Sequence, residues 1–232
     1  DVCSSDLFSH RAKMCSLASK GNGLRNLKIR TNKKKFIYLI SPIEINGGFY
    51  SELDLVLSTK KVSFFQLRLK NTSKKKYLNI GKKIKKICKK HKVFFIINDF
   101  PKLAKEIGAD GCHLGQGDMN ILDARKILGN KIIGITCHNK KELGKVALNF
   151  GADYLAFGAF FKSNTKKVKF KAKTKILKQF NKMTNKPLVA IGGINNKNYK
   201  NLLLNRANFL AISGYIWNNK KYKPIEAIRK LI

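Results

Sequence analysis

Short apolar runs alternate with amphipathic patterns along the chain from Lys35 onward. The apolar runs have the length of strands, and the segments between them repeat apolar residues every three or four positions, as helices do. This alternation is typical of successive βα units with buried parallel strands. Strands are predicted at residues 36–40, 62–68, 93–97, 111–114, 131–136, 153–157, 187–191 and 208–213.

Local signals mark where several of the intervening helices begin and end. Asn139 followed by Glu142 predicts a capping box, and Pro224 suits a first helical position. The tripeptide Gly-Ala-Asp occurs at 108–110 and at 151–153, where glycine can terminate a helix before the next strand. We interpret both tripeptides as structural turns.

Eight strands, each followed by a helix within about 200 residues, most simply close into a (β/α)8 TIM barrel of the α/β class. A doubly wound open sheet is the alternative fold. The barrel is expected to form a single catalytic domain over residues 36–232. Residues 1–35 are polar, basic and without periodicity, so we expect a poorly structured basic tail. Its opening string DVCSSDL resembles translated sequencing-adapter sequence, so we expect part of the tail not to be native. Its composition is also typical of a transit peptide.

The composition adds a very large positive charge. The chain has 49 Lys and Arg against 13 Asp and Glu, a net charge of +36, which suggests nucleic acid or another polyanion as a partner. However, the excess is mostly Lys spread along helix faces, with abundant Asn, Ile and Phe, as an AT-rich coding sequence produces. Because no recognition motif accompanies the charge, we expect no specific nucleic-acid partner and keep a basic nucleic-acid-binding protein as an alternative.

The cysteines and the hydropathy bear on the compartment. The five cysteines are odd in number and contain no close pair of the metal-binding or redox type, which fits a reducing cytoplasmic setting. No apolar run approaches the ~18 residues needed to cross a bilayer, so no membrane partner is expected. A homo-oligomer is compatible with the sequence, which leaves the oligomeric state open.

The stretch 94–118 carries a carboxylate at the end of each of two strands. Asp99 follows the third predicted strand and Asp118 the fourth. Because the carboxyl ends of neighbouring parallel strands lie side by side, both can face one volume, where oxygen ligands hold a hard cation such as Mg²⁺. The alternative for Asp99 is to cap the helix that Pro101 begins.

Polar residues also follow the other strands, at the end where a barrel carries its chemistry. The period of two in residues 66–70 points Gln66, Arg68 and Lys70 toward the barrel mouth. Further candidate positions at strand ends are Asn98, Thr136, Ser163, Thr165, Lys166, Gly193, Ile212 and Ser213. His138 is an acid or base candidate at a strand end, whereas His113 lies within a strand and is interpreted as structural.

This inventory indicates a class of substrate. Two carboxylates for a metal and three cations, Arg68, Lys70 and Lys166, suit a diphosphate. Glycines after the seventh strand and a small polar pair after the eighth are where barrels commonly hold a phosphate. We find no nucleophile with a paired base, no dinucleotide loop and no P-loop.

These motifs resemble the thiamine phosphate synthase and thiazole tautomerase-like family. The resemblance covers roughly residues 36–216 in order. It is carried by QLRLK (66–70), IIND (96–99), GADGCHLGQGD (108–118), IIGITCH (132–138), GADYLAFGAFF (151–161), NTK (164–166), AIGGIN (190–195) and AIS (211–213).

The resemblance implies a transferase that joins hydroxymethylpyrimidine diphosphate to thiazole phosphate and releases pyrophosphate through a pyrimidine carbocation. It implies Mg²⁺ at Asp99 and Asp118, with Gln66 on the pyrimidine. The diphosphate would be held by Arg68, Lys70, Asn98, Thr136 and Lys166, of which Arg68, Lys70 and Lys166 would be catalytic. Ser163 and Thr165 would line the thiazole side, and Gly193, Ile212 and Ser213 would bind its phosphate.

The sequence departs from the family pattern in two places. The sixth loop reads Lys-Ser-Asn-Thr-Lys at 162–166 where the family usually has Pro-Thr-x-Thr-Lys, and Thr136 replaces a usual serine. Tautomerase-like relatives tend to lose the diphosphate residues and use a histidine at the fifth strand end, where His138 stands. Retention of Arg68 and Lys70 together with both aspartates favours the synthase over the tautomerase.

Overall fold

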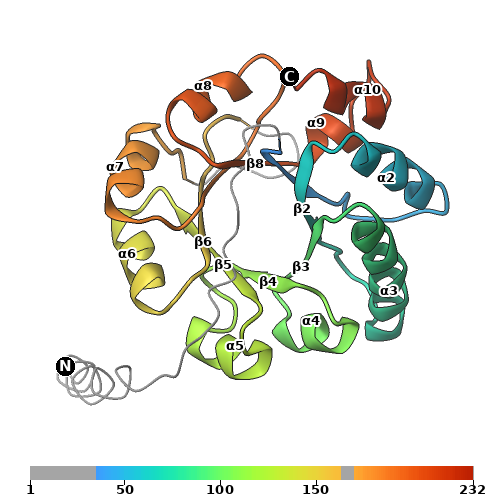
Figure 1. Cartoon of the computed structure of the whole chain (residues 1–232), viewed down its shortest axis with the longest axis horizontal. Coiled ribbons are helices and arrows are strands. Elements are labelled where there is room, and N and C mark those ends of the chain that lie inside the picture. Colours follow the sequence, from blue (N-terminus) through green and yellow to red (C-terminus); the bar gives the residue numbers. More distant parts are fainter. Residues whose placement is uncertain (1–34, 163–169, 232) are drawn as a thin grey trace.

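Eight parallel strands close into a barrel in the computed structural model, which describes residues 35–162 and 170–231. The strands follow one another in chain order, and β1 pairs with β8 through Ile37 and Leu210. Helices form a ring around them (Figure 1). The predicted (β/α)8 barrel is therefore confirmed, and the open sheet is excluded because it would leave β1 and β8 as edges. The predicted tail lies almost wholly outside the described residues.

Each of the eight predicted strands is present. Their bounds differ from the predicted ones by at most two residues, because strand ends lie where apolar runs give way to turns. The strands are β1 (Ile37–Ile40), β2 (Val62–Leu67), β3 (Phe94–Asn98), β4 (Gly111–Leu114), β5 (Ile132–His138), β6 (Tyr154–Gly158), β7 (Leu188–Ile191) and β8 (Phe209–Ile212).

The helices test the predicted start signals. In the described part of the chain they are α2 (Phe49–Ser58), α3 (Lys74–Lys90), α4 (Pro101–Ile107), α5 (Ile121–Leu128), α6 (Lys141–Asn149), α7 (Lys175–Met183), α8 (Tyr199–Leu204), α9 (Gly214–Trp217) and α10 (Pro224–Arg229). Pro224 does begin a helix. The capping box at Asn139 is wrong: Lys140 is the N-cap of α6, and the Asn139 amide instead donates to the carbonyl of Lys171, 3.2 Å away. None of these helices could span a membrane.

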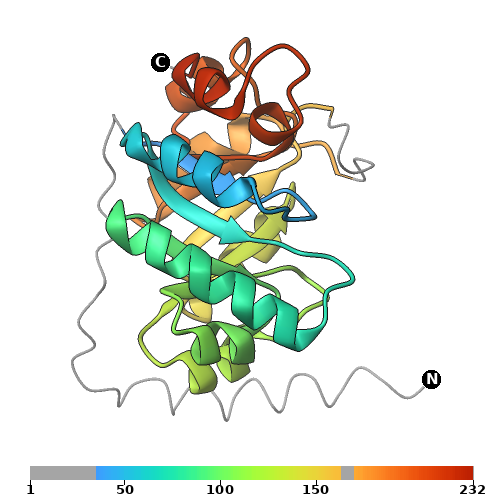
Figure 2. The ribbon, with the colours of Figure 1, turned by 90° about the vertical axis from the view of Figure 1, so that its right-hand side faces the viewer.

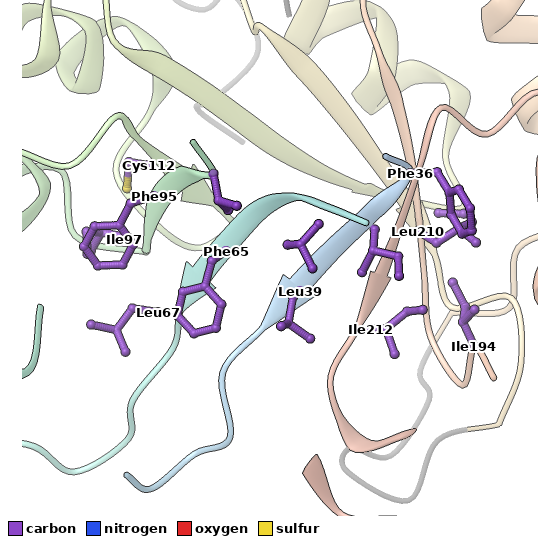
Figure 3. Packing of buried hydrophobic residues seen from close by; sticks show 14 of the residues in the cluster. Phe36, Leu39, Phe65, Leu67, Phe95, Ile97, Cys112, Ile194, Leu210 and Ile212 are labelled. Carbon is purple, nitrogen blue, oxygen red and sulfur yellow. The ribbon is translucent and has the colours of Figure 1, made fainter. Parts of the chain in front are cut away.

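Strand side chains alternate between two separate apolar layers. Outward-facing residues such as Leu39, Phe65 and Leu210 pack between the sheet and the helices, and Figure 3 shows them on neighbouring strands. Inward-facing residues fill the barrel, among them Phe64 and Phe209, whose rings meet edge to face at 5.1 Å. Burial on both faces explains why the strands read as continuous apolar runs.

Two aspartates tie the amino-terminal side of the barrel together. Asp110 accepts a hydrogen bond from the Phe95 amide at 2.7 Å, and Asp153 accepts one from the Ile133 amide at 2.9 Å. Each aspartate belongs to a Gly-Ala-Asp turn whose glycine has a positive φ, +71° at Gly108 and +81° at Gly151. Both turns therefore serve the structure, as predicted.

Arg125 on α5 links the same side of the barrel. Its guanidinium donates to the carbonyl oxygens of Gly129, Lys131 and Gly151 and to the carboxylate of Asp153, at 2.5 to 3.1 Å. One side chain thus provides hydrogen-bond donors to three carbonyl oxygens and a carboxylate in the turns before β5 and β6. A planar guanidinium with several donors suits this position, and a lysine could not reproduce it.

Replacing Arg125 with methionine is expected to lower the free energy of unfolding by about 2 kcal/mol, because the hydrogen bonds of a charged group are lost while most of the stem packing is kept. Urea denaturation would measure the change. Lys126→Met is the matched control, since Lys126 is 78% exposed in its side chain and its ion pair among the described residues is with Asp123, which is 50% exposed. Equal effects of the two substitutions would contradict a structural role for Arg125.

Candidate active site

The predicted site residues follow strands whose carboxyl ends all lie on one rim of the barrel. Figure 2 shows the barrel from the side, with β2 running toward the loop that leads into α3. The described residues at this rim are Gln66, Arg68, Lys70, Asn98, Asp99, Asp118, Thr136, His138, Gly193, Ile212 and Ser213. Ser163, Thr165 and Lys166 lie outside the described residues, so their roles stay predictions.

The ends of β2 and β3 are joined by two of these side chains. The Gln66 amide donates to the Asn98 side-chain oxygen at 2.7 Å. Gln66 is only 3% exposed, so this bond fixes an amide that would otherwise be costly to bury. Gln66 lies two positions after the inward-facing Phe64 and so points to the same side of β2; its binding of a pyrimidine stays a prediction.

Ser41 connects the ends of β8, β1 and β2, and the sequence analysis did not single it out. Its hydroxyl accepts a hydrogen bond from the Arg68 amide at 2.9 Å, and its carbonyl accepts one from the Ser213 hydroxyl at 3.1 Å. Arg68 is half-buried and Lys70 exposed. The backbone beneath the Arg68 side chain is therefore held in place. A polar residue directly after the apolar run 36–40 was the signal that could have revealed Ser41.

Asp99 sits at the end of β3 in an uncommon backbone conformation. Its φ is +64°, and its amide donates to the carbonyl of His113 on β4 at 2.8 Å. Phe100 occupies the N-cap position of α4, directly after Asp99, and capping by the Asp99 side chain stays the alternative interpretation. Left-handed conformations in a non-glycine residue often occur at functional sites.

Asp118 lies in the turn after β4, beside the strand end that carries Asp99. Its Oδ2 accepts a hydrogen bond from the Gly115 amide at 2.6 Å. Burial, together with the negative charges of Asp99 and Asp118, raises the pKa of the Cys112 thiol on β4. Both carboxylates therefore lie close to the same strand.

Asp99 and Asp118 carry the chemical type of ligand that a divalent cation takes, and Mg²⁺ at this position stays a prediction. The described residues contain no group of three or more His, Cys, Asp or Glu side chains that could hold a metal ion by themselves. Mg²⁺ is commonly held by one or two carboxylates plus substrate phosphates, and carboxylate oxygens are the ligands it prefers. Asp99 and Asp118 supply that number of carboxylates from neighbouring strand ends.

The end of β5 carries Thr136 and His138. Thr136 Oγ1 lies 2.8 Å from Nε2 of His113, and the Thr136 carbonyl accepts a hydrogen bond from the Gln116 amide. Burial lowers the pKa of His113 to about 4, so its ring is neutral at physiological pH. His138 has a φ of +50°, and its ring packs on Phe170 at 4.3 Å between centroids. Its role as an acid or base stays a prediction.

The glycines after β7 allow a close approach of two loops. Gly192 and Gly193 have φ values of +105° and +61°, and the Phe161 amide donates to the Gly192 carbonyl at 3.1 Å. A Cβ atom at Gly193 would overlap the carbonyl of Lys162. These glycines are thus required by packing, whatever ligand their amides also bind.

Ile212 and Ser213 face different environments. The Ile212 side chain is 2% exposed and packs in the outer layer beneath the helices (Figure 3). Only its backbone is available to a ligand at the mouth. Ser213 is half-buried directly after β8, where its hydroxyl is engaged with the Ser41 carbonyl.

The chain is similar in sequence and in structure to known proteins. A family profile described as thiamine monophosphate synthase matches residues 37–216. A thiamine-phosphate synthase of Pelagibacter ubique is 67% identical over 199 residues, which cover 85% of this chain and 96% of that protein. One of Erythrobacter litoralis is 39% identical, covering 84% and 94%. A solved thiamine phosphate pyrophosphorylase from Pyrococcus furiosus superposes with a TM-score of 0.76 at 26% identity, covering 87% and 95%.

Proposed function

This chain belongs to the thiamine monophosphate synthase family, a family of transferases in thiamine biosynthesis, and on that premise we propose how its barrel mouth carries out the reaction. The substrates are 4-amino-2-methyl-5-hydroxymethylpyrimidine diphosphate and thiazole phosphate. The products are thiamine phosphate and pyrophosphate. The single observation that carries the proposal is the 67% identity to a thiamine-phosphate synthase over most of both chains.

The pyrimidine diphosphate is assigned to the side of the mouth formed by β2 to β5. Gln66, fixed by its bond to Asn98, binds the pyrimidine ring. Arg68 and Lys70 lie after β2, where their charges bind the diphosphate, as charged donors bind phosphate oxygens. Thr136 at the end of β5 supplies a neutral donor to the same group. Lys166, outside the described residues, is proposed to join them.

The thiazole phosphate is assigned to the opposite side of the mouth, formed by β6 to β8. The amide of Gly193 and the backbone at Ile212 and Ser213 lie at the carboxyl ends of the last two strands, where barrels of this type commonly hold phosphate. Ser163 and Thr165, which lie outside the described residues, are proposed to line the thiazole ring. The two substrates then meet across the barrel axis.

The reaction needs charge stabilisation rather than acid or base chemistry. The bond between the pyrimidine methylene carbon and the diphosphate oxygen breaks, and its electron pair leaves with pyrophosphate. The thiazole nitrogen then donates its lone pair to the methylene carbon. Arg68 and Lys70 stabilise the negative charge that develops on the leaving group. Mg²⁺ held by Asp99 and Asp118 would supply further positive charge to that group.

A coupling assay tests this proposal directly. The full chain with both precursors and Mg²⁺ is expected to form thiamine phosphate and pyrophosphate in equal amounts, and the rate should fall to background when EDTA removes the metal. Chromatography of thiamine phosphate and an enzymatic pyrophosphate assay would measure the two products. Absence of thiamine phosphate with both precursors present would overturn the proposal, and turnover unaffected by EDTA would remove the metal from it.

A further inference from the structure

Four hydrogen-bonded side chains form a continuous chain from the barrel interior to its mouth. The Tyr38 hydroxyl lies 2.7 Å from the Tyr154 hydroxyl, and the latter lies 2.9 Å from Nδ1 of His113. Nε2 of His113 lies 2.8 Å from Oγ1 of Thr136. The residues come from β1, β6, β4 and β5, and only Thr136 among them belongs to the proposed substrate site. The chain thus connects the packed core with the diphosphate position.

The His113 ring has a hydroxyl group at each of its nitrogens, so its two neutral tautomers correspond to two directions in which the chain can be polarised. Burial raises the pKa of both tyrosines and lowers that of His113. A neutral imidazole donates from one ring nitrogen and accepts at the other. If Tyr38 donates to Tyr154, and Tyr154 to Nδ1, then Nε2 carries the proton and donates to Thr136. In the reverse direction Thr136 donates to Nε2, and Nδ1 carries the proton.

The buried end of the chain favours the first direction. Tyr38 is 2% exposed, and Tyr154 is the hydrogen-bond partner of its hydroxyl within the described residues. In the first direction the Tyr38 hydrogen goes to Tyr154, and every hydrogen in the interior has an acceptor. In the reverse direction the Tyr154 hydrogen goes to Tyr38, whose own hydrogen is then left without an acceptor. A buried donor without an acceptor is unfavourable.

The mouth end favours the same direction. A diphosphate at Thr136 offers only acceptor oxygens, so the Thr136 hydroxyl must donate to it. When Nε2 of His113 donates to Thr136, the hydroxyl hydrogen is free to point at the ligand. When Thr136 donates to Nε2 instead, its lone pairs face the anionic oxygens, which is repulsive.

We propose that His113 is a positioning residue held as the Nε2-protonated tautomer by Tyr154 and Tyr38, and that it presents the Thr136 hydroxyl as a donor to the diphosphate. The inference rests on the proposed function only through the ligand at Thr136. His113 itself does not touch the reacting atoms. It acts by fixing the direction of one hydroxyl before substrate arrives, so that no reorientation is needed on binding.

Nitrogen-15 NMR of the histidine-labelled full chain tests the tautomer. The His113 ring is assigned through its contacts with Tyr154 and Thr136. At pH 7.5 we expect a proton on Nε2 and none on Nδ1, both alone and with pyrophosphate added. A protonated Nδ1 in either sample overturns the proposal. This measurement uses the unsubstituted protein, so it does not depend on whether a variant folds.

A double-mutant cycle tests whether His113 acts through Thr136. Thr136→Val and His113→Leu are each expected to lower kcat/KM for the pyrimidine diphosphate by about 10- to 100-fold, the size expected for one lost hydrogen bond to a charged group. The double variant should be no worse than the more damaged single variant. Losses that multiply in the double variant would show that His113 acts independently of Thr136, and would overturn the positioning role.

The two proposals fail in different ways. If the coupling assay shows turnover but NMR shows the proton on Nδ1 of His113, the positioning role of His113 is wrong and the proposed synthase function stands. If NMR shows the proton on Nε2 of His113 but the coupling assay forms no thiamine phosphate, the proposed function is wrong and the assigned direction of the hydrogen-bond chain stands.

Discussion

Replacing Asp99 with asparagine is expected to reduce the rate of pyrophosphate release at a fixed Mg²⁺ concentration by roughly 100- to 1,000-fold. The amide is nearly the same shape as the carboxylate but carries no charge, so it is a much weaker ligand for a hard cation. Asparagine also tolerates the left-handed conformation at this position, where φ is +64°. The substitution therefore removes the metal ligand without a new backbone strain.

Steady-state rates across a Mg²⁺ titration would measure this effect. The variant should need a higher metal concentration and remain slower at saturation. Asp123→Asn is the matched control, because the Asp123 side chain on α5 is 50% exposed and pairs with Lys126 at 2.8 Å. Unchanged rate and metal requirement in Asp99→Asn would remove Asp99 from the metal site.

Replacing Arg68 with glutamine is expected to lower kcat/KM for the pyrimidine diphosphate by roughly 100- to 1,000-fold, comparable to the loss of one preorganised donor to a developing charge. The guanidinium is lost, whereas the Arg68 backbone keeps its 2.9 Å hydrogen bond to Ser41. The fold should therefore be preserved. The KM for thiazole phosphate should change little, because that substrate is assigned to the opposite side of the mouth.

Initial rates with each substrate varied in turn would separate these effects. Arg206→Gln is the matched control: Arg206 is exposed in the loop between α8 and β8, at the rim opposite to the mouth. The Arg206→Gln variant loses the same single positive charge as Arg68→Gln. It therefore also tests whether general attraction of anions by the +36 net charge accounts for the lower kcat/KM of Arg68→Gln. Equal losses in the two variants would contradict a specific role for Arg68.

The sequence allowed the fold and much of the candidate rim to be predicted for a shared physical reason. A strand buried on both faces must be apolar throughout, so polar residues such as Arg68 and Asp99 stand out where such a strand ends. Once the units alternate as β and α, parallel strands bring those ends to one rim. The sequence alone therefore predicts which residues lie at that rim.

Local signals were less reliable where a tertiary contact competed with them. Asn139 had the sequence of a capping residue, but its amide donates to Lys171 instead. Ser41 was passed over because its partners, Arg68 and Ser213, follow two other strands. The side chain of Ile212 proved to face the helices, because the alternation along β8 fixes its direction.

The amino-acid sequence by itself determined the order of βα units and the chemical types gathered at the carboxyl ends of the strands. Only the tertiary structure decided which of these groups pair, as Gln66 pairs with Asn98 and Tyr38 with Tyr154, which is 116 residues away in the chain. The reason is that periodicity is a local property, whereas a hydrogen bond across a barrel depends on closure and on the register between strands. That register also places the hydroxyls of Tyr154 and Thr136 beside the two ring nitrogens of His113, and these partners determine which nitrogen carries the proton in our proposal.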